Sequence, residues 1–297
     1  MTQRKSHLDG TALSVLFLCC LFWGSQQVLI KATLPFMAPV FQASVRFLGA
    51  TLLLMAWCYY KKIPLWQKDK SMWVGIIAGL LFALEFACLY TGLQYTSASR
   101  LTVFAYTAPF WVAFLVPIWV PSEKLNSIQW LGLILAFSGV ILALLDGLVG
   151  SSSLHWQGDL LALLAGLSWG LTTVVIKTTV LNKLSPEKLL FYQVAMSAIS
   201  LPFLSLALNE PWTMQMTYFS VSSLVIQTVL GAFISYLAWM WLLSRYPATK
   251  MSGFVFLTPV AAVMVGNLWL QEAITLALIG GLILVAIGMI LVNRKAN

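Results

Sequence analysis

Charged residues are scarce in this chain, and their scarcity excludes a soluble globular protein. Only 9% of the 297 residues are Asp, Glu, Lys or Arg, whereas 60% are hydrophobic and the mean hydropathy is +0.90. A soluble domain carries about 25% charged residues, enough to cover its surface. We therefore expect this chain to lie in an apolar solvent, the lipid bilayer.

Residues that carry out catalysis or hold metals are nearly absent as well. The chain has no GxxxxGK[ST] loop for ATP, no HExxH sequence and no Cys/His cluster for a metal. Its two histidines, His7 and His155, stand alone, and no paired-carboxylate motif for magnesium-bound diphosphate occurs. We therefore expect no enzyme activity and no cofactor. Cysteine does not indicate a redox compartment, because all four lie in apolar runs as small hydrophobes, namely Cys19, Cys20, Cys58 and Cys88.

Most of the sequence consists of apolar runs of about 20 residues, the length of a membrane-spanning helix. A bundle of α-helices is expected, because a helix satisfies its own backbone hydrogen bonds in lipid. The sequence predicts an all-α membrane protein with ten such spans, near residues 11–30, 36–60, 72–92, 98–120, 127–147, 156–177, 187–208, 217–241, 248–270 and 273–293.

The second half of the chain repeats the first. The segment WGSQQVLIK from Trp23 to Lys31 returns as WGLTTVVIK from Trp169 to Lys177, with Trp, Gly, Val, Ile and Lys in register. Five spans fall in each half, and an odd number turns the second repeat upside down relative to the first. We place the repeats at residues 10–147 and 156–293, with a linker at 148–155. Later pairs in register are Tyr90 with Trp241, Tyr95 with Tyr246, Pro109 with Pro259, Glu123 with Glu272, Gly132 with Gly281, and Gly139 with Gly288.

The net charge of +8 is distributed as in a membrane protein and not as in a nucleic-acid binder. If the N-terminus is cytoplasmic, 14 of the 17 Lys and Arg lie on the cytoplasmic side. Lys31 and Arg100 then lie on the outer side, and Arg46 lies inside a span. This is the positive-inside bias, and it predicts that both termini are cytoplasmic. The first apolar run resembles a signal peptide, but it contains the repeated segment, so we expect it to be retained.

Several motifs occur in an order found in a known family. They are FWGSQQVLIK and SWGLTTVVIK at the start of each half, VRF at 45–47, PSEKLNSIQWLGLILAFSGVIL at 121–142, LSRYPATKMSGFVFLTPVAAV at 243–263, and LQEAITLALIGGLILVAIGMIL at 270–291. Together they resemble the EamA-type repeat of the drug/metabolite transporter superfamily. The resemblance implies ten helices in two inverted five-helix repeats in a bacterial inner membrane. It also implies export of amino acids or related small metabolites.

Two ionisable residues lie deep in predicted spans, Arg46 in the second and Glu85 in the third. Each costs about 2.5–3.5 kcal/mol to insert there. One interpretation is a structural ion pair between them. The other has Glu85 facing a central cavity, where it meets a substrate ammonium group or carries a coupling proton. The second half has Ser197 and Tyr236 at the matching positions, so the pair is not repeated, which favours a functional Glu85. The resemblance favours a structural role for Arg46.

In the family resemblance, helices one, three, four, six, eight and nine surround the cavity. An aromatic chamber with few polar groups suits an amphipathic organic solute better than an inorganic ion. Packing or the interfacial belt is the alternative for each aromatic residue, and a Ser or Thr hydroxyl can bond only its own helix. A contact between Gln26 and Thr173 would cross the repeat interface. The candidate substrate-binding residues are Trp23, Gln26, Glu85, Tyr106, Trp169, Thr173, Tyr236 and Phe256.

Prolines and glycines indicate where helices bend or touch. Pro109 and Pro259 lie near the centres of the fourth and ninth spans, where a proline kinks a helix. Each kink is either a fixed bend that shapes the bundle or a hinge for alternating access. Gly24 and Gly170 would let the first and sixth spans approach closely. The fifth and tenth spans carry glycines that indicate lipid-side packing or a dimer contact, at Gly132, Gly139, Gly280, Gly281 and Gly288.

The sequence therefore favours a secondary transporter of small organic solutes. A drug or vitamin carrier of the same fold is the runner-up. A passive channel is disfavoured, because no span carries a continuous polar stripe, and an embedded enzyme or a receptor would bind or turn over a ligand without moving it. The substrate, the direction of transport, proton coupling and a homodimer are left open by the sequence.

Overall fold

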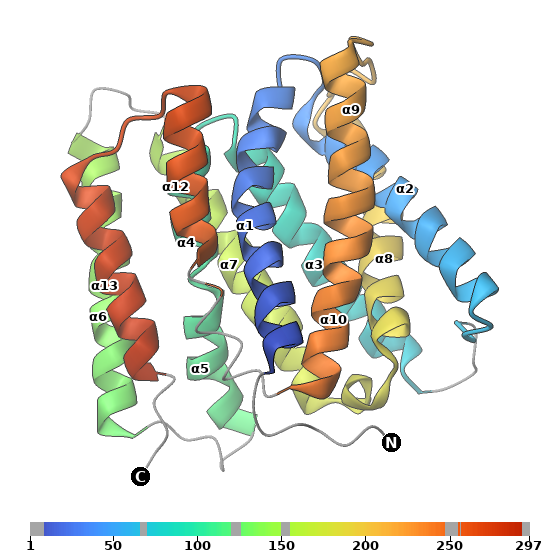
Figure 1. The fold of residues 1–297 in the computed structure, drawn as a ribbon, viewed down its shortest axis with the longest axis horizontal. Helices are drawn as coiled ribbons and strands as arrows, with labels where there is room; N and C mark the ends of the chain where they lie inside the picture. Colours follow the sequence, from blue (N-terminus) through green and yellow to red (C-terminus); the bar gives the residue numbers. More distant parts are fainter. Residues whose placement is uncertain are drawn as a thin grey trace.

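The computed structural model describes residues 9–65, 70–119, 126–149, 155–246, 255 and 257–292. These residues form a bundle of helices (Figure 1), and their one β-type pairing is an isolated bridge between Met37 and Met214. Six of the helices are long and apolar enough to cross a membrane, and three more apolar helices are shorter. The prediction of an all-α membrane protein is confirmed.

The helices begin where local sequence favours a helix start. The carboxylate of Asp9 accepts a hydrogen bond from Ala12 N at 2.9 Å, and Ser97 and Ser185 cap later helices in the same way. The first half forms α1 (Gly10–Thr33), α2 (Pro39–Tyr60), α3 (Met72–Gly92), α4 (Ala98–Ala105), α5 (Ala108–Trp119) and α6 (Ser127–Val149). The second half forms α7 (His155–Thr178), η2 (Val180–Lys183), α8 (Pro186–Ala207), α9 (Tyr218–Ile226), η3 (Gln227–Ser235), α10 (Tyr236–Arg245), α12 (Leu257–Leu270) and α13 (Leu276–Val292).

The fourth predicted span is two helices and not one. The break falls at Tyr106 and Thr107, and the Thr107 hydroxyl donates to the carbonyl of Phe104 at 2.7 Å. Pro109 lies in the first turn of α5, where a missing N–H removes no helical hydrogen bond. The expectation of a kinked but continuous helix is therefore wrong here, because the proline begins a new helix.

Pro259 occupies the corresponding place in the second half, as the third residue of α12. The residues of the ninth predicted span that precede this helix, 248–254 and 256, lie outside the described residues, as do Glu123 and most of the predicted linker. The role of the two prolines as hinges stays a prediction.

The eighth predicted span is continuous and consists of three segments in two helical forms. Its outer parts, α9 and α10, are α-helical, and the nine-residue segment η3 between them is a π-helix. π-helical turns are rare and are found mostly at functional sites. η3 packs against α2 and α1, so this unusual backbone lies in the middle of the bundle.

The two halves are interleaved. The most extensive helix contacts are α6 with α13, α3 with α7, α2 with α8, and α1 with α12, and each of them joins the first half to the second. Figure 1 shows α6 and α13 side by side at one edge of the molecule. The helices of each half therefore pack mainly on the other half, and the halves are repeats without being separate domains.

The glycines of the fifth and tenth spans lie in this interface. A Cβ atom added at Gly139 would come within 2.6 Å of the carbonyl of Gly281, and one added at Gly288 would touch the carbonyl of Gly132. Only glycine allows the two backbones to come so close. These residues pack α6 on α13 within one chain, and this contact accounts for them without lipid or a second copy.

The predicted approach of the first and sixth spans at Gly24 and Gly170 is wrong. A Cβ atom at Gly24 would lie 2.5 Å from the carbonyl of Thr258 on α12, and one at Gly170 would lie 2.6 Å from Cβ of Trp111 on α5. The two glycines are still equivalent in the repeat. Each lets its helix approach the proline-started helix of the opposite half.

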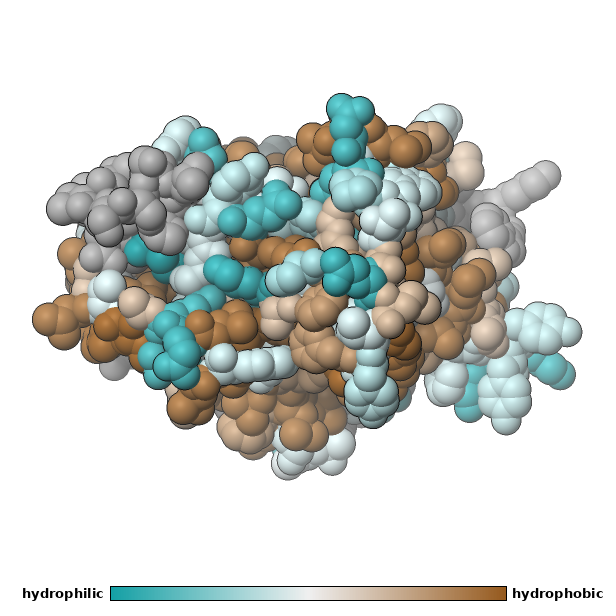
Figure 2. All heavy atoms as spheres, turned by 90° about the horizontal axis from the view of Figure 1, so that it is seen from above, coloured by the Kyte–Doolittle hydropathy of each residue, from teal (hydrophilic) through white to brown (hydrophobic). Residues whose placement is uncertain are grey.

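Both ends of the described chain lie at the same end of the bundle. α1 begins and α13 ends at the lower end in Figure 1. At the opposite, upper end, hydrophilic residues gather across the middle of the face (Figure 2). The assignment of the lower end to the cytoplasm stays a prediction from the charge distribution.

Candidate functional site

Arg46 lies at the centre of the bundle with no exposed surface. Its Nη1 donates to the hydroxyl of Tyr90 on α3 at 2.8 Å, and its Nη2 donates to the hydroxyl of Tyr236 on α10 at 2.9 Å. The guanidinium carbon lies 5.2–5.9 Å from the ring centroids of these tyrosines and of Phe47 and Phe86. Such cation–π contacts stabilise a desolvated cation by about 2 kcal/mol. Phenols and aromatic rings therefore hold this charge in the place of a carboxylate.

Glu85 is buried close by, with 7% of its surface exposed. Among the described residues no ion pair joins it to Arg46. The two side chains lie close enough to interact electrostatically. Glu85 Oε2 and Arg46 Nε are both buried without a hydrogen-bond partner. The direct ion pair expected from the sequence is therefore not formed, because Tyr236, which matches Glu85 in the second repeat, takes the place beside the arginine.

A buried chain of hydrogen bonds between amides and hydroxyls continues from Tyr90, one of the partners of Arg46. The Tyr90 hydroxyl donates to Gln227 Oε1 at 3.0 Å, and Gln42 Nε2 donates to the same oxygen at 3.1 Å. Gln227 Nε2 in turn donates to the hydroxyl of Ser223 at 2.9 Å. Sequence reasoning did not single out Gln42 or Gln227. Their signal was two amides in the middle of apolar spans, where polar groups need partners.

Trp23 and Tyr236, both predicted site residues, are brought together. Trp23 Nε1 donates to the hydroxyl of Ser235 at 2.8 Å, at the end of the π-helix. The Trp23 ring lies 6.1 Å from that of Tyr236 and 5.4 Å from that of Trp239. Tyr236 also packs edge-on against Phe82, at 6.0 Å. Aromatic rings from α1, α3 and α10 therefore surround the two charged residues.

Gln26 reaches the same place from α1. It is 2% exposed, and its Oε1 has no hydrogen-bond partner. A methyl group added at Gly231 would contact this oxygen and would lie 3.3 Å from Arg46 Nη2. Gln26 and Arg46 therefore both pack against Gly231 of the π-helix. The expected contact between Gln26 and Thr173 is not among the described hydrogen bonds, since the Thr173 hydroxyl donates to the carbonyl of Trp169.

Tyr106 connects the helix break to this group. Its ring packs edge-on against Trp169 at 5.1 Å, and its phenol interacts electrostatically with Glu85. Trp169 thus joins the site through Tyr106, whereas the predicted site residue Phe256 lies outside the described residues. We call the buried residues around the two charges the central cluster, which consists of Trp23, Gln26, Arg46, Glu85, Tyr90, Tyr106 and Tyr236.

We expect Gly231→Ala to reduce transport about 10- to 100-fold while leaving the protein folded. The added methyl group takes the space that Gln26 and Arg46 share, and displacing a buried polar group costs about 1–3 kcal/mol. Because the end of the Gln26 side chain can turn away, the fold tolerates the change. Solute flux and thermal stability measured on the same preparation test this, with Gly10→Ala as the control, since a methyl group at Gly10 meets nothing within 4 Å. Wild-type flux in Gly231→Ala would contradict the placement of the cluster.

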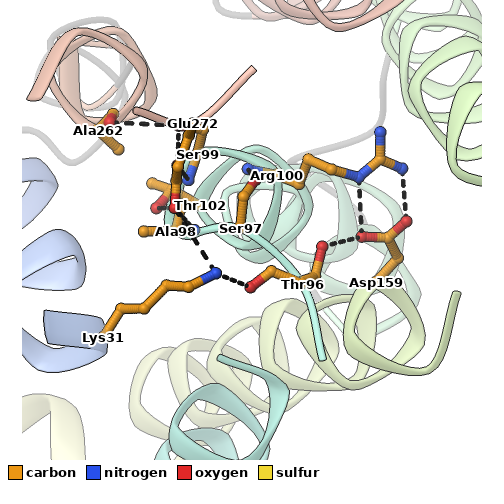
Figure 3. A network of polar contacts seen from close by, with 10 residues as sticks. All are labelled: Lys31, Thr96, Ser97, Ala98, Ser99, Arg100, Thr102, Asp159, Ala262 and Glu272. Carbon is orange, nitrogen blue, oxygen red and sulfur yellow. Dashed lines mark hydrogen bonds and ion pairs between the residues drawn. The ribbon is translucent and has the colours of Figure 1, made fainter. Parts of the chain in front are cut away.

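A second group of charged residues lies at the upper end of the bundle (Figure 3). The Glu272 carboxylate accepts hydrogen bonds from Ala98 N at 2.7 Å, Ser99 N at 3.0 Å and the Ser99 hydroxyl at 2.5 Å. It thereby caps the first turn of α4, where a negative charge is favoured. Lys31 Nζ lies 3.7 Å from Glu272 and donates to the carbonyl of Thr96 at 2.6 Å.

The same group contains a buried ion pair. Arg100 Nη2 lies 2.6 Å from Asp159 Oδ2, and the Asp159 side chain is fully buried. The Thr96 hydroxyl donates to the other Asp159 oxygen at 3.0 Å. α1, α4, α7 and the end of α12 are thereby tied together, so both halves meet here. We call Lys31, Thr96, Ser99, Arg100, Asp159 and Glu272 the upper cluster. The sequence predicted Lys31 and Arg100 on the outer side but did not identify their partners.

Comparison with known proteins agrees with a transporter. The profile of the EamA-like transporter family matches residues 10–145 and 156–294. An uncharacterized transporter of Synechocystis sp. is 30% identical over 295 residues, which cover 92% of this chain and 87% of the relative. A protein of Salmonella typhimurium named "Probable amino-acid metabolite efflux pump" is 26% identical, covering 90% of this chain and 89% of its own. A crystal structure with 18% identity superposes with a TM-score of 0.68 over 95% of this chain and 97% of the other, which shows the fold.

Proposed function

Since this chain belongs to the EamA-like transporter family and is a multi-pass membrane transporter, we propose that it exports amino acids or related small metabolites by alternating access. The two inverted halves would rock about a site at their interface. We propose the bacterial inner membrane as its location, on the basis of its charge distribution and of bacterial relatives. One of these relatives is named as an amino-acid metabolite efflux pump.

One observation carries the proposal. Glu85 and Arg46 are an acid and a base buried inside the bundle, and each keeps a polar atom without a hydrogen-bond partner. Ionisable groups deep in a membrane protein are costly and usually mark a pathway or a binding site. A group whose only role was structural would be expected to satisfy its own polar atoms. These atoms are therefore suited to bind a polar solute that enters from outside the protein.

The surrounding fold supports a site that moves a solute. The cluster draws residues from α1, α2, α3, α10 and the break after α4, so both halves contribute to it. Two irregular backbone segments border it, the break at Tyr106 and Thr107 and the π-helix η3. In transporters built from inverted repeats, binding sites lie near broken helices at the repeat interface. A shift between inward-open and outward-open states then needs only a few kcal/mol of differential binding.

The test is efflux of a panel of labelled amino acids from proteoliposomes, with and without a pH gradient. We expect saturable loss of one chemical group of amino acids. We expect Glu85→Gln to slow that loss about 10-fold or more, because an interaction with a charged group contributes about 1.5–3 kcal/mol. If Glu85 carries the coupling proton, stimulation by the gradient also disappears in this variant.

Each alternative result has a defined meaning. No loss of any amino acid from vesicles that hold folded protein would rule out amino-acid export and point to drugs or vitamins. Loss that does not saturate would indicate a channel. Equal rates for Glu85→Gln and wild type at every pH would remove Glu85 from the mechanism.

A further inference from the structure

We infer that the central cluster recognises the zwitterion of a free α-amino acid with an apolar side chain. Glu85 takes its ammonium group, and Arg46 takes its carboxylate. The inference rests on the proposed function and makes its substrate specific, because it excludes amines, carboxylic acids and amides that lack one of the two charges.

The first argument comes from the balance of charge. Glu85 and Arg46 are buried at 7% and 0% exposure and lie near each other, but no ion pair joins them. A buried charge is costly unless it is paired. A carboxylate ligand would pair with Arg46 and leave Glu85 Oε2 without a partner, and an ammonium ligand would leave Arg46 Nε–H without an acceptor. A zwitterion supplies a partner to both residues and brings no net charge into the site.

The second argument comes from which atoms are available. The two terminal nitrogens of Arg46 already donate to Tyr90 and Tyr236, whereas its Nε–H donates to nothing. Nε–H is thus a donor suited to a carboxylate. Glu85 Oε2 and Gln26 Oε1 are acceptors without donors. They are suited to an ammonium group, which has three N–H donors and no acceptor.

The third argument concerns the rest of the ligand. The side chains that pack around these atoms are aromatic, with Trp23 and Tyr236 in contact and Phe82 and Phe86 both 6.0 Å from the Tyr236 ring. Burying an apolar side chain against such rings stabilises binding by about 25 cal/mol per Å². A charged side chain would find no third partner among the cluster's described residues. Leucine, methionine and phenylalanine fit this environment, and lysine and glutamate do not.

The experiment is a binding series on purified full-length protein in detergent, measured by calorimetry. The probes are six apolar L-amino acids, from valine to tryptophan, and three relatives of L-phenylalanine. N-acetylphenylalanine lacks the ammonium group, phenylalanine amide lacks the carboxylate, and phenethylamine lacks the carboxyl carbon. We expect at least one apolar amino acid to bind, and each relative that lacks a charge to bind about 10- to 100-fold more weakly than its parent.

Variants assign each charge to its residue. Glu85→Gln should weaken binding of the amino acid, so that it no longer binds better than its N-acetyl relative. Glu210→Gln is the matched control, because the Glu210 carboxylate accepts from Val40 N and Phe41 N at the start of α2, outside the cluster. It should leave selectivity unchanged. If Arg46→Gln fails to fold, the comparison of acid with amide on the wild-type protein still tests the carboxylate contact.

The outcomes separate this inference from the proposed function. Phenethylamine or N-acetylphenylalanine binding as tightly as phenylalanine would overturn the zwitterion site even if vesicles transport amino acids. Selective binding without flux would keep the site and overturn the transport proposal. No binding by any of the six amino acids would overturn the inference as well.

Discussion

Replacing Asp159 by asparagine will destabilise the protein by about 3–5 kcal/mol, the usual cost of removing one partner from a buried ion pair. The Asp159 carboxylate is fully buried, lies 2.6 Å from Arg100 Nη2, and also accepts a hydrogen bond from Thr96. In the variant, the buried guanidinium keeps its charge and loses the carboxylate that it contacts at 2.6 Å. The measurement is unfolding of the purified protein followed by circular dichroism.

The double variant Asp159→Leu with Arg100→Met is the control for this prediction. Removing both side chains leaves neither member of this pair without the other, and an apolar pair of similar size is often as stable as the ion pair it replaces. The double variant should therefore recover most of the loss. If the free energy of unfolding of Asp159→Asn is within about 1 kcal/mol of the wild-type value, Asp159 does not form the buried ion pair with Arg100 that the structure shows.

Replacing Gly24 by valine will separate α1 from α12 and cost about 3 kcal/mol, near the upper end of the usual cost of overpacking. A Cβ atom at this position lies 2.5 Å from the carbonyl of Thr258 and 2.8 Å from the amide nitrogen of Ala262. Both are backbone atoms, so no flexible side chain can move aside. Because Trp23 precedes Gly24, the same displacement moves the central cluster, and flux should fall together with stability.

Gly10→Val is the matched control for Gly24→Val. It makes the same substitution on the same helix, at a position where an added Cβ meets nothing within 4 Å. It should be neutral in both unfolding and transport. A stable and active Gly24→Val protein would show that α1 and α12 are not in contact during the transport cycle.

The fold was predictable where it depends on composition and period. Runs of apolar residues identified the helices, and the repeat from Trp23 and from Trp169 gave two related halves. The break at Tyr106 and Thr107 was not predictable, because the run from 98 to 120 stays apolar through it. A proline in such a run is equally compatible with a kink inside one helix and with the first turn of a second helix.

The central cluster was predictable in part. Trp23, Gln26, Glu85, Tyr106 and Tyr236 were expected near one another, and the structure gathers them. The partners of Arg46 were not predictable, because they depend on how helices of opposite halves are rotated about their axes. The sequence shows an acid and a base at similar depth, and only the packing shows that two tyrosines take the place of the acid.

The upper cluster was missed for a similar reason. Counting spans placed its bases Lys31 and Arg100 on the same side, but an acid in a loop can lie in water or cap a helix with the same sequence. Glu272 caps α4 because the ends of α12 and α4 meet across the two halves. Contacts of this kind appear only once the halves are assembled.

Interleaving of the halves also constrains how such a protein could have arisen. The first turns of α2 and α4 are capped by Glu210 and Glu272, which both belong to the other half. An ancestral five-helix chain that inserted in one direction only would have had no such partner. The ancestor of this protein would therefore have had to insert in the membrane in both orientations and to pair with an inverted copy of itself. Duplication and fusion of the gene would then have fixed the two orientations in a single polypeptide.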